Sequence, residues 1–150
     1  MKILILCTGN SCRSQMAQAL LSSFHHSLEV FSAGTAPAEQ VNPNAVIVMN
    51  ELGIDMSKAY PKSVNQYLDE EWDYVITVCG GANENCPTFS GNVNHRLHFG
   101  FDDPAAVKGD TDYVIAEFRR IRDEIKDRFY TFYLKEINLR GLTNVSDNNE

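Results

Sequence analysis

The residues with the clearest chemical potential lie together near the N-terminus, in the stretch Cys7-Thr8-Gly9-Asn10-Ser11-Cys12-Arg13-Ser14. A cysteine thiolate is a nucleophile, and an arginine presents a planar fork of donors that matches two oxygens of a phosphate-like anion. Gly9 and Asn10 tolerate positive φ, which allows successive backbone N–H groups to point inward. We therefore expect Cys7 to attack a tetrahedral oxyanion that residues 8–13 bind.

The elements around this stretch would position it well. The apolar run at 3–6 predicts a buried strand that ends at Cys7, and a helix is expected to begin at Ser14. Unpaired N–H groups at a helix N-terminus favour anions, and the same field favours the thiolate form of Cys7. Ser14 is placed to donate its hydroxyl to that thiolate. Alternatively, Cys7 is only a small apolar residue at the end of a core strand.

The loop at 7–14 resembles the phosphate-binding loop of the low-molecular-weight tyrosine phosphatase fold, and most closely that of the arsenate reductases that share the fold. The resemblance covers residues 1–132 and implies a three-layer α/β/α architecture with a central four-stranded parallel sheet. The chain's own pattern favours a parallel α/β sheet, because strands and helices alternate. We expect strands at 2–6, 28–32 and 73–78, and helices at 14–26, 43–52 and near 63–69. The last helix carries an apolar stripe that we assign to the core, formed by Val114, Phe118, Ile121, Ile125, Phe129 and Phe132.

A second pair of cysteines lies in the middle of the chain, where Cys79 ends an apolar strand and Cys86 follows in a polar loop. Paired cysteines of a cytosolic chain are more often catalytic or metal-binding than structural. The resemblance implies that Cys79 and Cys86 relay a disulfide, which a phosphatase does not need. Two unrelated thiols are the alternative. Parallel sheets bind ligands beyond the carboxyl ends of their strands, so one site could hold both Cys7 and Cys79.

An acidic residue precedes a proline at Asp103-Pro104. Proline holds the preceding residue in extended geometry, which fixes where its carboxylate points. The resemblance implies that Asp103 is the general acid that protonates the leaving oxygen. Asp102 is expected to be a turn or capping residue, and an ordinary solvated turn is the alternative for both carboxylates. Tyrosine phosphatases of this fold usually carry an aromatic residue after the proline, whereas this chain has Ala105, which disfavours an aryl slot.

The resemblance thus implies an arsenate reductase with a three-cysteine relay. Cys7 forms an adduct with arsenic, Cys79 attacks Cys7 so that arsenite leaves, and Cys86 then attacks Cys79. Gly80 and Gly81 would permit the outward movement that exposes the last disulfide. No tightly bound cofactor is expected. The reductant would be an external dithiol, thioredoxin or a glutaredoxin-type protein, and phosphate or sulfate would compete with arsenate.

Two other functions stay open at this stage. A low-molecular-weight protein tyrosine phosphatase or phosphomonoesterase would need three of the same groups, Cys7, Arg13 and Asp103. A zinc-binding structural module would use a different set, although its spacing fits no common zinc pattern. The candidate zinc ligands are Cys79, Cys86, His95 and His98.

A monovalent cation is in doubt for this chain. Cation-binding members of the resembled family place acidic groups near Asn10 and Ser32 to hold potassium, and here those places are Gln18 and Lys62. We expect no metal and hypothesise that the Lys62 ammonium replaces the potassium ion. An exposed lysine without a role is the alternative. Cys12 has no redox role in the relay and is assigned as a structural loop residue.

Composition bounds the remaining possibilities. The 150 residues are 43% hydrophobic and 22% charged, as expected for one globular domain. A net charge of −7 with 13 Lys and Arg argues against nucleic acid or an anionic membrane as a partner. The N-terminal apolar run is too short for a membrane span or signal peptide, so we expect a cytoplasmic protein. We assign 1–140 to the domain, with the aromatics at 130–135 packed on it rather than forming a contact surface, and 141–150 to a disordered polar tail.

Overall fold

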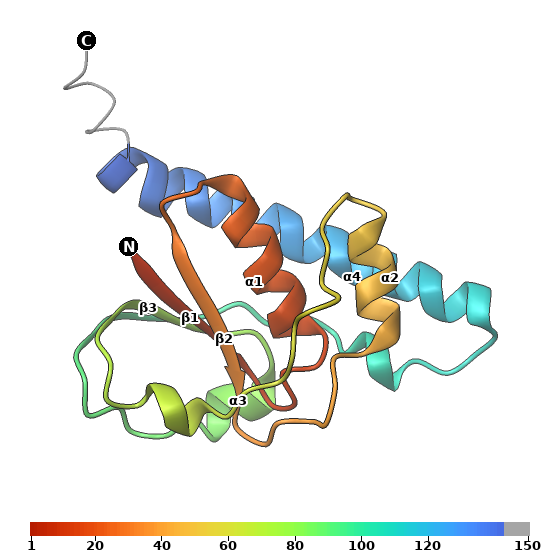
Figure 1. The fold of residues 1–150 in the computed structure, drawn as a ribbon, viewed down its shortest axis with the longest axis horizontal. Helices are drawn as coiled ribbons and strands as arrows, with labels where there is room; N and C mark the ends of the chain where they lie inside the picture. The colour runs from red at the N-terminus through yellow and green to blue at the C-terminus, as the bar shows by residue number, and fades with distance from the viewer. Residues whose placement is uncertain (143–150) are drawn as a thin grey trace, which may run out of the picture.

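The computed structural model describes residues 1–142, which form a parallel sheet between two groups of helices (Figure 1). The sheet order is β2-β1-β3-β4, and every neighbouring pair of strands is parallel. The expected four-stranded parallel sheet is therefore confirmed. The strands are β1 (Lys2–Cys7), β2 (Glu29–Gly34), β3 (Trp72–Thr77) and β4 (Val93–His98).

The helices cover the sheet from both sides. α1 (Arg13–Phe24) packs along α4 (Thr111–Phe132), and α2 (Pro43–Asn50) packs on α4 as well. The short helix α3 (Gly80–Glu84) contacts β1 and β3 from the other side, where the 3₁₀ turn η1 (Val64–Tyr67) also lies (Figure 1). A second 3₁₀ turn, η2 (Pro104–Ala106), precedes α4.

Two parts of the expected secondary structure needed correction. The helix expected near 63–69 is the single turn η1, which buries Val64 and Tyr67 three residues apart, the spacing of a 3₁₀ turn. The fourth strand of the expected sheet had not been located in the sequence, because β4, Val-Asn-His-Arg-Leu-His, lacks an apolar pattern. Its residues are mostly exposed, since β4 is an edge strand with one neighbour.

The apolar stripe of α4 forms the core, as expected. Its residues at 118, 121, 125, 129 and 132 are buried, and Val114 is partly buried. Arg122 lies on the same helix and is also buried. Its Nη1 donates to the carbonyl oxygen of Val48 over 2.9 Å and to Glu51 over 2.8 Å, which joins α4 to α2.

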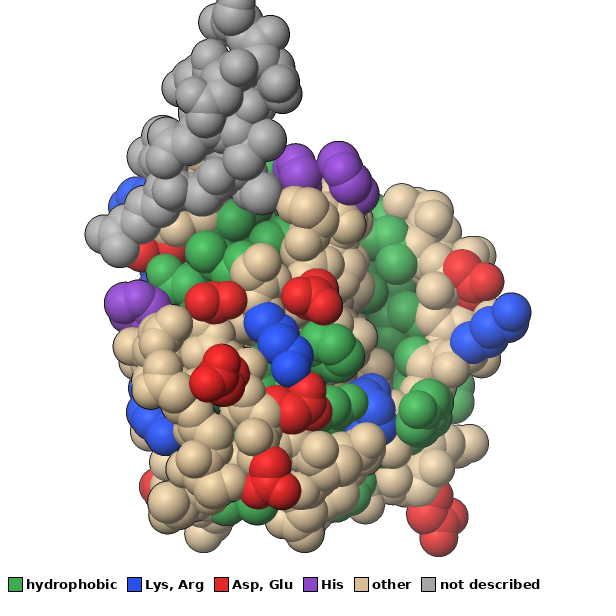
Figure 2. All heavy atoms as spheres, turned by 60° about the vertical axis from the view of Figure 1, so that its left-hand side comes forward, with side chains coloured by type: hydrophobic (Ala, Val, Ile, Leu, Met, Phe, Trp, Pro, Cys, Tyr) green, Lys and Arg blue, Asp and Glu red, His purple; other side chains and the backbone are tan. Residues whose placement is uncertain are grey.

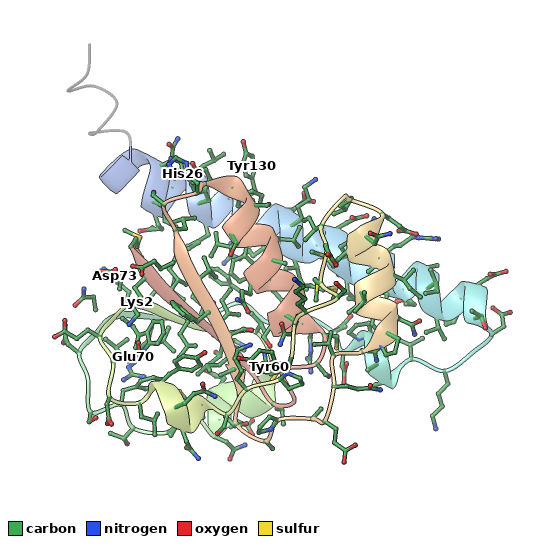
Figure 3. The ribbon with its side chains drawn as sticks, viewed as in Figure 1. Lys2, His26, Tyr60, Glu70, Asp73 and Tyr130 are labelled. Carbon is green, nitrogen blue, oxygen red and sulfur yellow. The ribbon has the colours of Figure 1, made fainter. Side chains whose placement is uncertain are left out.

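The chain continues from α4 into a π-helix, η3 (Tyr133–Leu142), whose first residues pack on the domain. The ring of Tyr133 lies 5.7 Å from that of Phe24, and Phe132 packs edge-on against Tyr74 at 5.0 Å. The aromatics of this segment therefore pack on the domain as predicted, although Tyr130 is half exposed beside the end of α1 (Figure 3). The tail assigned to 141–150 lies outside the described residues apart from its first two positions.

Charged side chains of both signs are interspersed on the face shown in Figure 2, where Lys and Arg form no continuous stripe. At the far end of the sheet from Cys7, Lys2 forms an ion pair with Glu70, and its backbone N–H donates to Asp73 over 2.7 Å (Figure 3). None of the helices within 1–142 combines the length and apolar character needed to cross a bilayer.

Candidate active site

The sheet register brings the two strand-end cysteines to one edge. Leu6 pairs with Thr77, so Cys7 and Cys79 follow at the carboxyl ends of the adjacent strands β1 and β3. Thr8 connects them, because its Oγ1 lies 3.3 Å from the Cys79 sulfur. The expectation that one site could hold both thiols agrees with this arrangement.

The loop after β1 turns its carbonyl groups outward. The carbonyl oxygens of Cys7, Thr8, Gly9 and Ser11 accept hydrogen bonds of 2.8–3.2 Å from backbone N–H groups at positions 35, 36, 38 and 42. A trans peptide directs its N–H opposite to its carbonyl, and the described residues contain no cis bond. The N–H groups of the loop therefore face the interior, which makes it a cradle for an anion.

The sulfur of Cys7 receives hydrogen bonds inside this cradle. The backbone N–H of Asn10 donates to Sγ over 3.1 Å, and Ser14 Oγ lies 2.8 Å from Sγ. Asn10 Nδ2 donates to Ser14 Oγ over 2.7 Å, which leaves the Ser14 hydroxyl proton free for the sulfur. Cys7 is 3% exposed, so these donors act on a buried nucleophile.

Asn10 is the structural centre of the loop. It has a φ of +51°, a left-handed conformation that asparagine tolerates, and it is fully buried. Its Oδ1 accepts from Gln15 Nε2 and from the backbone N–H of Lys62, both over 3.0 Å. These two donors fix the amide so that its Nδ2 faces Ser14 and Ser32.

Amide side chains bond the groups near Asn10 and Ser32. Ser32 Oγ donates to Gln18 Oε1 over 2.5 Å, and Gln15 Nε2 donates to the carbonyl oxygen of Tyr60 over 2.9 Å. Tyr60 lies near the start of α1 (Figure 3), and the Lys62 Nζ donates to its carbonyl over 3.0 Å and lies 5.0 Å from its ring. The ammonium thus contacts Tyr60, and the replacement of potassium by Lys62 stays a hypothesis.

The Arg13 guanidinium has partners at Nη1 and Nη2 but none at Nε within residues 1–142. Its Nη1 donates to the carbonyl oxygen of Phe101 over 3.0 Å, and its Nη2 lies 3.7 Å from Asp103 Oδ2. Its Nε is buried and has no hydrogen-bond partner among residues 1–142. A buried donor without a partner is costly, and an oxyanion in the cradle would satisfy it.

The two neighbouring carboxylates differ, but the capping role expected of Asp102 belongs to Asp103. Asp103 caps η2 through its Oδ1, which accepts from the Ala105 N–H over 3.0 Å, and its other oxygen faces Arg13. Asp102 lies one residue too early to cap η2; it is exposed and lies 3.5 Å from Arg120. The side chain of Asp103 is 41% exposed, so solvent reaches its carboxylate.

Cys12 is the second buried thiol of the loop at 7–14. Its Sγ lies 3.9 Å from Asp103 Oδ1. Burial, followed by the nearby carboxylate of Asp103, raises the pKa of Cys12 to about 11. Cys12 is therefore a neutral thiol near pH 7, which fits a structural assignment.

The second pair of cysteines flanks α3. Cys79 caps this helix, because its Sγ accepts from the Ala82 N–H over 3.3 Å. Gly81 allows the helix to approach the cradle, since a Cβ there would lie 2.7 Å from Thr8 Oγ1. Cys86 follows the helix and is half-buried. All four cysteines are free thiols.

The candidate zinc ligands do not form a site. His98 Nδ1 lies 2.8 Å from the Thr77 hydroxyl, and the ring of His95 stacks on that of Tyr74 at 4.8 Å. Within residues 1–142, no three His, Cys, Asp or Glu side chains are grouped closely enough to hold a metal ion.

Three groups of the site were not predicted. Gln15, the Tyr60 carbonyl and the Phe101 carbonyl orient Asn10 and Arg13. Two are backbone oxygens from distant loops, for which sequence has no signal. Gln15 lies five residues after Asn10, and only its polarity at a buried helix position could have indicated it.

Fold and site together define a phosphatase-type oxyanion cradle. The chain belongs to the low molecular weight phosphotyrosine protein phosphatase family, whose model matches residues 2–141. Its curated relatives include the arsenate reductases of Halalkalibacterium halodurans, 47% identical, and of Bacillus subtilis, 43% identical. Each match spans 131 residues, 87% of this chain and 93% of the relative.

Similar solved structures include several arsenate reductases. An arsenate reductase in the phosphate binding state has a TM-score of 0.75 at 27% identity, covering 89% of this chain and 97% of that one. The arsenate reductase from Archaeoglobus fulgidus has a TM-score of 0.64 at 28% identity, covering 87% and 97%. The resemblance seen in the sequence is thus confirmed.

Proposed function

We propose that this protein reduces arsenate to arsenite through a relay of Cys7, Cys79 and Cys86, with thioredoxin as the external dithiol. The observation that carries the proposal is the contact between the oxyanion cradle and a second thiol, made by Thr8 Oγ1 and the Cys79 sulfur. A phosphatase needs the cradle and the general acid but no second thiol. The identity to curated arsenate reductases over most of the chain supports the same reaction.

The first step is nucleophilic attack in the cradle. Loop N–H groups and the free Arg13 Nε would bind the arsenate oxygens. The Cys7 thiolate attacks arsenic while Asp103 protonates the leaving hydroxyl, which departs as water. The product is a covalent adduct between Cys7 and pentavalent arsenic.

The second step transfers electrons. The Cys79 thiolate attacks the Cys7 sulfur, and the sulfur–arsenic bond breaks with its electron pair on arsenic. Arsenic is reduced by two electrons and leaves as arsenite, while a Cys7–Cys79 disulfide forms. The Ala82 N–H and the Thr8 hydroxyl contact the Cys79 sulfur and would orient it for this attack.

The third step moves the disulfide toward solvent. Cys86 attacks Cys79, and Cys7 leaves as a thiolate that the Asn10 N–H and the Ser14 hydroxyl receive. Cys79 and Cys86 lie at opposite ends of α3, so this five-residue helix must rearrange to let them bond. An exposed Cys79–Cys86 disulfide would then be open to thioredoxin, which fits a cytoplasmic, reducing location.

The test couples the purified protein to thioredoxin, thioredoxin reductase and NADPH. We expect arsenate-dependent NADPH oxidation in the wild type and its loss in Cys79→Ser. Without any reductant, the wild type should release one arsenite per chain. If the wild type releases this one arsenite but shows no NADPH oxidation with thioredoxin, the partner would be a glutaredoxin-type protein instead.

A chromogenic aryl phosphate provides the control for the phosphatase alternative. Rapid hydrolysis that survives Cys79→Ser, together with no arsenite release from the wild type, would contradict the proposed function. The mutant protein should still bind phosphate, because Cys79 lies outside the cradle, and this binding shows that its loop is intact.

A further inference from the structure

A small cavity lies beside Cys86 at the sheet edge. It has a volume of about 220 Å³, and its walls come from β3, β4 and α3. Besides Cys86, the lining residues are Val75, Thr77, Asn83, Arg96, Leu97 and His98. The Thr77 hydroxyl holds two of the walls, since it lies 2.8 Å from His98 Nδ1 and 3.4 Å from Asn83 Oδ1.

Arg96 contributes a guanidinium to this cavity. It lies on β4 opposite Val75 of β3, and its Cζ lies 5.4 Å from the centre of the Phe89 ring. Phe89 is buried three residues after Cys86, so the ring orients the guanidinium beside the same loop. Arg96 and Cys86 thus line the same cavity from β4 and from the loop after α3.

Arg96 is the charged group that acts on Cys86. The titratable groups on the cavity walls are Arg96 and His98, both from β4, while β3 and α3 contribute the uncharged Val75, Thr77 and Asn83. Burial raises the pKa of Cys86, and the charge of Arg96 opposes this rise. Without the guanidinium, less of Cys86 would be thiolate at neutral pH.

We propose that Arg96 is a positioning residue that holds Cys86 and stabilises its thiolate for the attack on Cys79. This inference rests on the proposed function for the attack itself. Cys86 gives its proton to solvent, its thiolate forms a bond to the Cys79 sulfur, and the Cys7–Cys79 bond breaks with its electron pair on Cys7. The exchange is redox-neutral and needs no further reactant.

The first test measures Cys86 in the reduced protein, without arsenate. The rate at which iodoacetamide alkylates Cys86 is followed from pH 6 to 11 by mass spectrometry of the peptide that carries it. We expect Arg96→Gln to move the midpoint upward by about one pH unit and to slow alkylation about tenfold at pH 7. Arg96→Lys should restore part of the loss, because it keeps the charge without the planar fork.

The second test measures the exchange itself. After one arsenate turnover without reductant, conversion of the Cys7–Cys79 disulfide to Cys79–Cys86 should be about tenfold slower in Arg96→Gln at pH 7. The two rates should converge as the pH rises further, because a growing share of Cys86 is then thiolate in both proteins. A residue with a merely structural role would not show this recovery.

A matched control removes one positive charge elsewhere, from the exposed Lys126 of α4. Superimposed alkylation profiles for Arg96→Gln and wild type would overturn the inference, as would an equal shift in Lys126→Gln. If the wild type forms no Cys7–Cys79 disulfide with arsenate, the proposed function fails. The alkylation profile still decides whether Arg96 acts on Cys86.

Discussion

Two buried thiols in one loop have opposite surroundings. Cys7 is contacted by the Asn10 N–H and the Ser14 hydroxyl, which are groups that donate to a thiolate. Cys12, five residues later, lies near the carboxylate of Asp103, which disfavours a second negative charge. Both side chains are almost fully buried, so burial does not distinguish the two thiols. The neighbouring groups distinguish them, because donors contact the Cys7 sulfur while a carboxylate lies near the Cys12 sulfur.

Cys12 should make stability depend on pH in the alkaline range. Its pKa rises from 9.0 to about 11 on folding, so the folded protein holds this proton more tightly than the unfolded chain. The stability from the neutral thiol is complete below pH 9 and is lost as the pH rises toward 11, by about 3 kcal/mol in all. Urea unfolding of wild type and Cys12→Ala from pH 8 to 11 checks this. An identical decline in both would contradict the prediction.

Among the elements, α3 lies beside the cradle and joins two cysteines of the proposed relay, Cys79 and Cys86. Cys79 caps its N-terminus, Cys86 follows two residues after its last residue, and Gly81 brings it close to the cradle. A five-residue helix gains little stability from its own hydrogen bonds, so its rearrangement during the relay costs little free energy. The close approach at Gly81 therefore sets how near Cys79 lies to the cradle, while the short helix permits later movement.

Gly81→Ala should slow the second chemical step. The new Cβ would lie 2.7 Å from Thr8 Oγ1, so α3 or the Thr8 side chain must shift. We expect Cys7–Cys79 disulfide formation to slow about tenfold or more, since small misplacements of reacting atoms are costly. The rate is measured after arsenate addition in a Cys86→Ser background, which stops the relay at that disulfide.

Gly80→Ala is the matched control for this step, because a Cβ at position 80 meets no atom within 4 Å. It should leave Cys7–Cys79 disulfide formation unchanged. Equal rates in both variants would mean that the approach of α3 to Thr8 does not position Cys79.

At the scale of the whole molecule, the last helix extends the core beyond the catalytic sheet. η3 continues from α4, and Ile137 is fully buried on it, while Tyr133 packs against Phe24 of α1. Tyr74 of β3 donates its hydroxyl to Glu136 over 3.2 Å, at the opposite end of the sheet from the cradle. The segment thus contributes to stability at a distance from the chemistry.

Ile137→Ala should destabilise the protein by about 3 kcal/mol, because it removes buried methylene and methyl groups and leaves a cavity. The same change at Leu134, which is 38% exposed on the same segment, should cost about 0.5 kcal/mol or less. Urea unfolding measures both, and arsenite release in a single turnover should be unchanged. Equal stability losses would show that this segment does not share the core.

Long-range contacts explain what the sequence could not locate. The hydrogen bonds that Gln15 and Gln18 make to Asn10 and Ser32 appear only in three dimensions. The fourth strand was expected but not located at 93–98, because an exposed edge strand needs no apolar alternation. Arg96 gave no local signal, since its role arises only when β4 brings it beside Cys86.

The sequence predicted the thiol loop and the parallel sheet. These depend on contiguous residues, such as the apolar run before Cys7, the positive φ that Asn10 tolerates and the arginine six residues after the cysteine. The folded chain alone reveals how Asn10 is oriented, which donor of Arg13 has no partner within residues 1–142 and what lies beside Cys86. The physical reason is that hydrogen bonds between distant segments follow from the packing of the sheet and helices, which local residue preferences do not encode.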